Sequence, residues 1–530
     1  MRDFSLPGRS LAVGRRGMAA TSHPASTLTA VDILRQGGNA IDAAVAACAV
    51  QCVVEAGSTG IGGDCFALLS VRGSDDILAF NGSGHAPAAA TVERLRAEGV
   101  ISIERTSAHA VTVPGAVDAW TSLIADHGRL CMKDVLAPAV ALAKGGYAVS
   151  PRVAHDLAAQ LAIVERDELA RDTFLVDGKA PQVGALQYQP KLADTLEAIG
   201  RDGRNAFYCG EVAQDMVERL QSAGGLHTLD DFAAAQGEYV QTIKTSFRGY
   251  DIHECPPNGQ GIIALLILNI LSHFPGSGDP LEVNRLHVEV EATRLAYAAR
   301  DRLLADPQKA EVPVDYLLSD KLAEELAAQI NLDHAIEDLP RFDQVEHKDT
   351  VYICVVDEDR NAVSFINSIF SPYGSGIMAP KSGVLFHNRG QSFSLESGHP
   401  NAIAPGKRPM HTIIPGMVTK DGRAVMPFGV MGGHYQALGH AHLLSKVFDY
   451  GLDLQTAIEL PRLFPLPGTK QIDIEGRLRD SIGEELLRRG FELRTPESAM
   501  GGAQAIWIDW ERGVLLGGSD TRKDGLALGI

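Results

Sequence analysis

The sequence predicts an α+β fold in which mixed sheets are covered by helices. Two patterns predict it: the first half of the 530-residue chain alternates helix-like and strand-like segments, and the chain beyond residue 350 is rich in short, glycine-separated apolar strands. The composition is that of a globular protein, with 45% hydrophobic and 22% charged residues. A chain of this length forms two or three domains or one large layered fold.

Helices are expected where apolar residues recur at three- and four-residue spacing. These segments are 28–36, 40–54, 283–304, 436–448 and 480–490.

Strands are expected in both halves of the chain. Residues 58–71 form a glycine turn that runs into a buried strand, and 75–84 is its expected hairpin partner. A second hairpin is expected around the turn DEDRN, with VYICVV (351–356) and AVSFI (362–366) as its strands. Three further strand-like segments are GVLFHN (383–388), HTIIPGMV (411–418) and AVMPFGVMGG (424–433).

Residues 332–349, LDHAIEDLPRFDQVEHKD, are acidic, interrupted by proline and without a clear period. Such a segment is typical of an exposed, flexible linker. The sequence therefore predicts a boundary at 349/350.

The charge balance excludes a class of partner. The chain has 66 acidic and 48 basic residues, a formal net charge of -18. A nucleic-acid-binding surface needs the opposite field, so no nucleic-acid partner is expected. The N-terminal residues contain no apolar run of signal-peptide length, and 40–54 is too short to span a bilayer. A cytoplasmic protein without a membrane partner is expected. The seven cysteines show no repeated CxxC pair, so free thiols are expected.

Two motifs give weak signals for a bound group. GIGGDC (60–65) resembles a phosphate-binding loop, but it lacks a following Lys-Ser/Thr pair and leads into a strand. His434, His440 and His442 do not share one helical face, and no carboxylate pattern accompanies them. No metal and no cofactor are expected, although a metal amidohydrolase remains an alternative.

A threonine and a glycine pair could act together. A threonine at a new chain start carries an α-amine with a pKa of about 7.7–8.0, which can act as base for its own hydroxyl. Cleavage between Asp349 and Thr350 would create that arrangement. Gly432 and Gly433 lie between an expected strand and an expected helix, where free N–H groups can hold negative charge. The alternatives are an ordinary β-forming threonine and a simple tight turn.

Eight motifs spread over nearly the whole chain occur in the order of one enzyme family. The motifs are GMAATSHPAS (17–26), DILRQGGNAIDAAVAA (32–47), STGIGGDCF (58–66), VPGAVDAW (113–120), DTVYICVVDEDRNAVS (349–364), GHPNAIAPGKRP (398–409), VMGG (430–433) and GSDTRKDG (518–525). On these motifs the chain resembles the γ-glutamyltransferases, within the N-terminal-nucleophile hydrolases.

The resemblance implies a four-layer αββα sandwich made as a precursor that cuts itself. Residues 1–349 would become the large subunit and 350–530 the small one, forming an αβ heterodimer or a dimer of such heterodimers. Thr350 would attack the Asp349 carbonyl and then serve as the nucleophile. Gly432 and Gly433 would form the oxyanion hole, and Ser368 would be the second hydroxyl that orients the nucleophile.

The resemblance also identifies departures at the substrate-binding positions. Val92 and Ser392 stand where γ-glutamyl enzymes have the arginine and the acidic residue that hold the substrate's α-carboxylate and α-amino groups. Phe370 replaces an asparagine. His411 replaces a serine, while Thr412 keeps the neighbouring hydroxyl.

Arg389 stands where those enzymes have a neutral amide, and a guanidinium there could bind the carboxylate of a small acidic substrate. Its alternative role is a structural ion pair. The expected activity is therefore hydrolysis of a small acidic amide, with oxamate, the substrate of one branch of the family, favoured. The alternatives are a glutathione hydrolase or γ-glutamyl transferase, a cephalosporin- or glutaryl-type acylase, and an uncleaved, non-catalytic binding scaffold.

Overall fold

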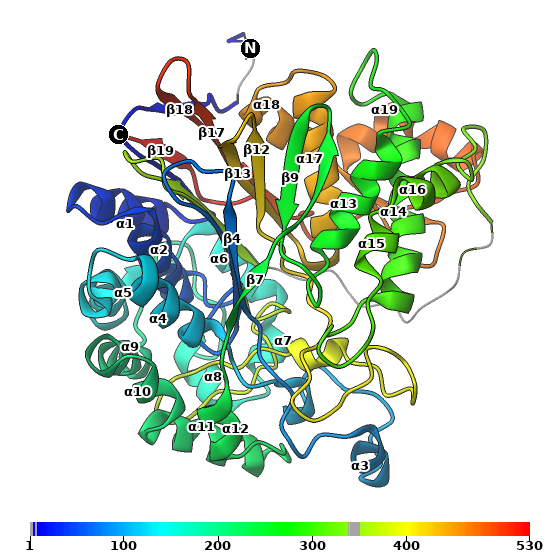
Figure 1. The fold of residues 1–530 in the computed structure, drawn as a ribbon. Coiled ribbons are helices and arrows are strands. Elements are labelled where there is room, and N and C mark those ends of the chain that lie inside the picture. The colour runs from blue at the N-terminus through cyan, green and yellow to red at the C-terminus, as the bar shows by residue number, and fades with distance from the viewer. Residues whose placement is uncertain (1–3, 6–7, 338, 340–349) are drawn as a thin grey trace.

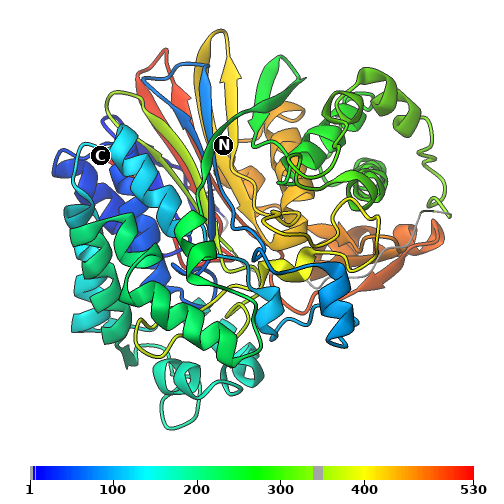
Figure 2. The same cartoon turned by 60° about the horizontal axis from the view of Figure 1, so that its bottom comes forward.

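The computed structural model describes residues 4–5, 8–337, 339 and 350–530. It confirms the predicted α+β class and the four-layer αββα sandwich that the resemblance implies. Two seven-stranded sheets lie face to face, and each is covered on its outer face by helices (Figures 1 and 2). The strands and turns of these two sheets position the candidate site.

Both large sheets are antiparallel at every strand pair rather than mixed. The first sheet contains, in spatial order, β19 (Ala527–Gly529), β2 (Met18–Ala20), β10 (Val351–Val356), β11 (Ala362–Ser368), β3 (Asp64–Ser70), β4 (Ile77–Gly82) and β7 (Glu238–Gln241). The second contains β1 (Ala12–Gly14), β18 (Val514–Ser519), β17 (Gly502–Asp509), β13 (Arg423–Met431), β12 (Gly416–Lys420), β9 (Tyr250–Glu254) and β8 (Ile243–Phe247).

The predicted boundary at 349/350 does not separate two domains. In the first sheet, β10 pairs with β2 and β11 pairs with β3, so strands from both sides of the boundary alternate. Both parts of the chain also contribute strands to the second sheet. Two fragments produced by cleavage there would remain joined by strand pairing.

Two helical layers cover the sheets. The first sheet is covered by α1 (Pro24–Arg35), α2 (Ala40–Val54), α4 (Ala116–His127), α5 (Met132–Gly145), α9 (Pro190–Asp202), α10 (Arg204–Tyr208) and α11 (Glu211–Ser222). The second is covered by α13 (Gly261–Leu271), α14 (Val283–Leu303), α16 (Asp320–Ala327), α17 (Gln436–Phe448) and α18 (Leu454–Glu459). The segments predicted to be helical match α1, α2, α14, α17 and α19 (Gly476–Arg488) in type and approximate position.

The remaining elements are peripheral to this sandwich. They are α3 (Val92–Ala97), α6 (Pro151–Ala159), α7 (Leu161–Val164), α8 (Glu168–Phe174), α12 (Leu229–Ala234), α15 (Val314–Leu317), the sheet of β14 (Leu463–Pro465), β15 (Gln471–Ile474) and β16 (Glu492–Arg494), the pair β5 (Tyr147–Ala148) and β6 (Leu186–Gln187), and the 3-10 turns η1 (Ala108–Ala110), η2 (Arg389–Ser392) and η3 (Gly433–Tyr435).

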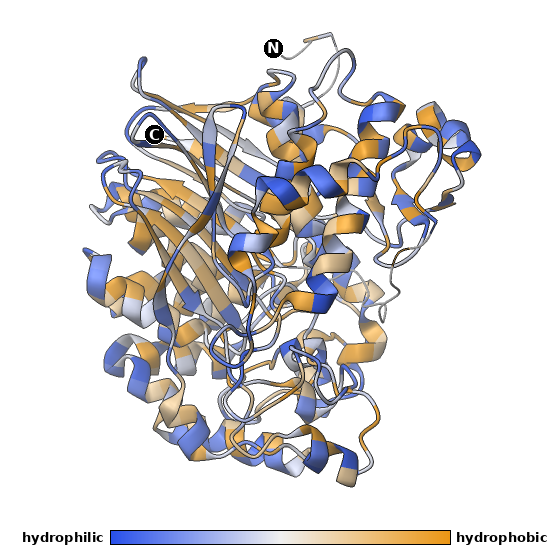
Figure 3. Ribbon diagram, turned by 45° about the vertical axis from the view of Figure 1, so that its right-hand side comes forward, coloured by the Kyte–Doolittle hydropathy of each residue, from blue (hydrophilic) through white to orange (hydrophobic). Residues whose placement is uncertain are grey.

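Strand β10 shows why both of its faces are apolar. Ile353 and Val355 pack into the core under the helices, while Tyr352 and Cys354 pack between the two sheets. Successive side chains of a strand point to opposite faces, so a strand in an inner layer must be apolar throughout. Figure 3 shows the apolar residues gathered on the strands and on the helix faces turned toward them.

One predicted strand is wrong, and only the last three residues of another, 411–418, lie in a strand, β12. Residues 383–388 do not join a sheet; they form two isolated bridges, Gly62 with Phe386 and Met378 with Leu385. The Phe386 N–H donates to Ile377 O, and its carbonyl accepts from Ser375 N–H. These local partners satisfy the backbone without a neighbouring strand.

The first residues of the predicted linker are anchored. Ala335 is buried and its N–H donates to Arg489 O at 2.7 Å, while Ile336 O accepts from Arg294 Nη2 at 3.0 Å. Most of 338–349, including Asp349, lies outside the described residues, so the flexible linker and the cleavage boundary stay predictions. Among the helices described, none is both long and apolar enough to cross a bilayer.

Candidate active site

The hairpin β10–β11 brings Thr350 and Ser368 together. Thr350 immediately precedes β10, and the register that pairs Val351 with Asn367 puts Ser368 beside it. The two side-chain oxygens are 3.2 Å apart, and both residues are buried. A hydroxyl at this distance can hold the Thr350 hydroxyl in one orientation, as predicted for Ser368.

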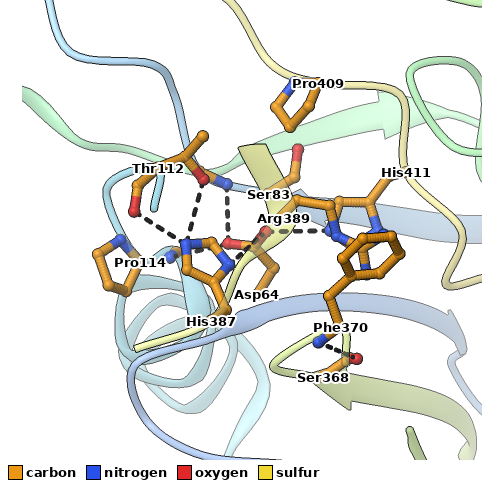
Figure 4. Close-up of polar contacts among 12 residues, drawn as sticks. Asp64, Ser83, Thr112, Pro114, Ser368, Phe370, His387, Arg389, Pro409 and His411 are labelled. Atoms are coloured by element: carbon orange, nitrogen blue, oxygen red, sulfur yellow. Dashed lines mark hydrogen bonds and ion pairs between the residues drawn. The ribbon is translucent and has the colours of Figure 1, made fainter. Parts of the chain in front are cut away.

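A second contact links this pair to the substrate-binding positions. The Ser368 hydroxyl accepts a hydrogen bond from Phe370 N–H at 2.9 Å, a contact visible in Figure 4. Phe370 has a φ of 76°, in the left-handed region that bulky residues rarely adopt. Its ring lies 3.8 Å beneath the Arg389 guanidinium. A strained backbone held by such contacts is typical of a functional site.

Arg389 is the most unusual charge in this region. It lies on η2, is only 1% exposed, and donates from Nη1 to Thr412 Oγ1 at 2.9 Å. Its buried Nη2 has no hydrogen-bond partner among the described residues, and no described carboxylate forms an ion pair with Arg389. Burial lowers the pKa of Arg389 to about 9, against the opposing effect of Asp64. The group remains a cation at neutral pH.

Asp64, which the sequence analysis did not identify as a site residue, lies at the centre of a buried polar cluster (Figure 4). Its Oδ2 is 3.0 Å from His411 Nε2 and 3.5 Å from His387 Nδ1. Its Oδ1 accepts the N–H groups of Gly84 and Gly115. Burial alone would raise the pKa of Asp64, but the two histidines hold it well below its usual range. Asp64 is therefore an ionised carboxylate whose oxygens are already engaged.

His411 is neutral and turned toward Asp64. Burial, followed by the charge of Arg389, lowers the pKa of His411 to about 3. Its Nδ1 accepts Ile413 N–H at 3.3 Å, so Nε2 carries the proton donated to Asp64. Both ring nitrogens are thus used within the protein. The substrate-binding role of His411 stays a prediction.

The glycine pair lies at the strand-to-helix junction that the sequence indicates. β13 ends at Met431, Gly432 and Gly433 have φ angles of 114° and 56°, and η3 leads into α17. Both glycines are buried. Neither N–H has an acceptor among the described residues. Buried backbone N–H groups without a partner are rare, and a pair of them can bind a developing oxyanion.

The remaining predicted positions lie outside this set of contacts. The buried Ser392 hydroxyl has no hydrogen-bond partner in the described part of the chain, and the Ser392 carbonyl accepts from Asn401 Nδ2. Val92 begins α3 and packs into a small apolar cluster with Phe393. Positions 92 and 392 therefore provide neither the cation nor the carboxylate that the family resemblance leads one to expect for binding a γ-glutamyl amino acid.

The three histidines near α17 have separate partners. His434 Nδ1 contacts Arg300, His440 Nδ1 contacts Glu254, and His442 Nδ1 contacts Glu289. Among the described residues, no group of His, Cys, Asp and Glu has the arrangement of a metal site.

Residues 26–530 match the profile of the family described as Gamma-glutamyltranspeptidase. The chain belongs to this family. The match covers the Thr350–Ser368 pair, the glycine turn and the Arg389 region, so one family profile spans every part of the site.

Relatives differ in the substrate that their names state. A glutathione hydrolase-like YwrD proenzyme of Bacillus subtilis is 36% identical over 98% of this chain and 99% of its own length. An oxamate amidohydrolase proenzyme of Klebsiella pneumoniae is 34% identical over the same shares. The crystal structure of a cephalosporin acylase from Bacillus halodurans superposes with a TM-score of 0.93, at 38% identity, over 100% of this chain and 99% of its own.

Proposed function

We propose that this chain is an amide hydrolase that matures by cleaving itself between Asp349 and Thr350 and acts on a small amide carrying a carboxylate. Oxamate, an amide directly beside a carboxylate, is the favoured substrate. Two full-length relatives are named as proenzymes, which supports maturation by cleavage. The described strand pairing across the boundary supports an αβ heterodimer of the two fragments.

The observation that carries the substrate class is the open Nη2 of Arg389. Asp64 acts on Arg389 only from a distance, and a buried cation without a direct ion pair costs several kcal/mol, so a protein retains it where a ligand supplies the missing partner. The contacts from Thr350 through Ser368 and Phe370 to Arg389 support a single site for this cation and the proposed nucleophile. A carboxylate on the substrate would offset the cost.

The same geometry disfavours γ-glutamyl substrates. These carry an α-ammonium group, which needs a buried acceptor. Asp64 is the described carboxylate that acts on Arg389, and its oxygens already accept from His411 and two backbone N–H groups, with His387 Nδ1 3.5 Å away. Position 392 offers only a serine hydroxyl. A monoanion without an amino group fits these residues better.

The mechanism follows from the placement of the groups. The freed α-amine of Thr350 takes the proton of the Thr350 hydroxyl, and the oxygen attacks the substrate amide carbon. The N–H groups of Gly432 and Gly433 stabilise the oxyanion, and loss of one such donor typically costs about 10²–10³ in rate. Ammonia leaves with a proton from the amine, and water activated by the same amine then hydrolyses the ester. Ser368 keeps the nucleophile oriented.

A substrate panel with one variant tests this assignment. Ammonia or amine release is measured with oxamate, glutathione, a γ-glutamyl anilide and a glutaryl amide. We expect oxamate to have the highest kcat/KM, and Arg389→Met to lower it about 10²-fold, the value of a charge-assisted contact.

Oxamide, in which a second amide replaces the carboxylate, is the matched control. Its hydrolysis to oxamate and one ammonia should have the same initial rate in both proteins, before oxamate accumulates. An unchanged KM of Arg389→Met for the best acidic substrate would remove the carboxylate assignment. A fully active protein that remains one uncleaved chain would remove the mechanism, and loss of activity on chelation would favour a metal amidohydrolase instead.

A further inference from the structure

We propose that Gln260, held by Arg300, is the positioning residue that sets the geometry of the oxyanion turn. This inference rests on the proposed function, because it concerns how Gly432 and Gly433 are held for the reaction. Gln260 directly precedes α13 and is fully buried. It is separated by 173 positions from the glycine turn that it contacts.

The Gln260 side-chain amide donates both of its hydrogens to two parts of the site. Nε2 donates to Gly433 O at 3.0 Å and to Thr412 O at 2.8 Å. Its backbone N–H donates to His411 O at 2.8 Å. One residue therefore ties the oxyanion turn to the segment that contacts Arg389.

Arg300 orients the Gln260 side-chain amide by donating to its oxygen. Nη1 donates to Gln260 Oε1 at 3.0 Å and to His434 Nδ1 at 2.9 Å, so its two hydrogens have one acceptor each. The guanidinium lies 4.3 Å above the Tyr297 ring, and the Tyr297 hydroxyl donates to His434 O. Because Oε1 accepts from Arg300, the Nε2 end of the amide must face the two carbonyls. This orientation cannot reverse without placing Oε1 against them.

The glycine turn needs external ties of this kind. Two consecutive glycines have more backbone freedom than any other pair, and ordering them has an entropic cost. The peptide plane before Gly433 is set by Tyr435 N–H, which donates to Gly432 O at 3.0 Å. The plane after it is set by Gln260 and by Gln436 N–H, which both donate to Gly433 O. The N–H of Gly433 lies in the first of these planes, opposite the Gly432 carbonyl that Tyr435 holds. Gln260 holds the second plane, on the other side of the Gly433 Cα, and the two planes together fix φ and ψ of Gly433.

The test measures acylation by 4-nitrophenyl acetate, which carries no carboxylate and so bypasses Arg389. The Thr350 oxygen forms a bond to the ester carbon, the bond to 4-nitrophenolate breaks, and the hydroxyl proton passes to the Thr350 amine. We expect a burst of 4-nitrophenolate in the wild type and at least a 10-fold slower burst in Gln260→Met, with little change in the ester concentration that gives half the maximal burst rate.

Gln189 provides a matched control. It also directly precedes a helix, is 3% exposed, and donates from Nε2 to Val53 O at 2.7 Å in the other helical layer. Gln189→Met loses a comparable buried amide, so it should lose comparable stability in urea unfolding but keep the wild-type burst rate. Arg300→Lys leaves Gln260 in place with weaker support, and an intermediate burst rate is expected.

The outcomes separate this inference from the proposed function. Equal burst rates in Gln260→Met and Gln189→Met would overturn the positioning role alone. A cleaved wild-type protein that gives no burst would overturn the nucleophile assignment and this inference with it. If Gln260→Met does not fold, a wild-type burst rate in Arg300→Lys overturns the inference, and a slowed burst supports it.

Discussion

The active site and the interface between α14 and α17 both bury charged residues, but they satisfy them differently. At the interface, Glu289 Oε1 lies 2.7 Å from Lys446 Nζ and 3.0 Å from Arg285 Nε, and Oε2 lies 2.8 Å from His442 Nδ1. Arg285 also pairs with Asp449. At the active site, Arg389 Nη2 and the N–H groups of Gly432 and Gly433 have no partner among the described residues.

This difference separates structural charge from functional charge. Burial raises the pKa of Glu289, yet Lys446, His442 and Arg285 outweigh it and hold that pKa well below the usual value. Each charge of this network has a counter-charge within the protein. Under the proposed function, the unpaired groups of the candidate site would instead be satisfied by a substrate carboxylate and an oxyanion, the state that a catalytic site should stabilise.

The largest expected effect is the loss of the predicted nucleophile. Thr350→Ala should remain a single full-length chain and lose at least about 10⁴-fold in turnover, because one hydroxyl serves both cleavage and catalysis. Its urea midpoint should stay close to that of an uncleaved wild-type sample, since the site does not hold the fold together. Mass spectrometry and ammonia release measure both properties. Thr350→Ser, which keeps a hydroxyl, is the control; normal cleavage of Thr350→Ala would contradict the assignment.

The Glu289 network should show the opposite behaviour, a loss of stability without a loss of activity. Lys446→Met should lower the free energy of unfolding by about 3 kcal/mol, because it leaves Glu289 buried with fewer counter-charges. The kcat/KM of the folded fraction should not change. Urea unfolding monitored by fluorescence gives the stability.

The double variant Glu289→Gln/Lys446→Met tests whether the cost comes from an uncompensated charge. It should recover much of the lost stability, since a neutral amide replaces the stranded carboxylate. A double variant as unstable as the sum of its two single variants would show that the network is not coupled, and the contrast with the active site would fail.

Parts of the site could be predicted because local pattern determines them. The alternation around DEDRN predicts the β10–β11 hairpin, and its register alone brings Thr350 to Ser368. The position of Gly432 and Gly433 between a strand and a helix is also readable from the sequence. Arg389 was found only through its departure from a family pattern.

Other parts depend on contacts between distant segments, for which no local period exists. Asp64 and His411 are 347 positions apart in the sequence. Gln260 is buried, but the residues around it do not predict which groups its side chain contacts. One local signal was available: a carboxylate that ends the glycine turn GIGGDC and opens an entirely buried strand is costly without partners. The apolar pattern of 383–388 predicts a strand, but this segment forms single bridges rather than a ladder.

The smallest expected effect concerns Phe370, whose ring packs against the guanidinium of Arg389. Phe370→Leu keeps an apolar side chain at the left-handed position but removes the ring 3.8 Å from Arg389. A desolvated cation–π contact contributes about 1 kcal/mol, so KM for oxamate should rise about 5-fold while kcat is unchanged. Phe174→Leu is the control, because Phe174 is a buried ring that contacts Tyr373 rather than a cation. Both variants should lose similar stability, and only Phe370→Leu should change KM. An equal KM in the two variants would mean that the ring beneath Arg389 supports the fold and not the binding of the substrate's carboxylate.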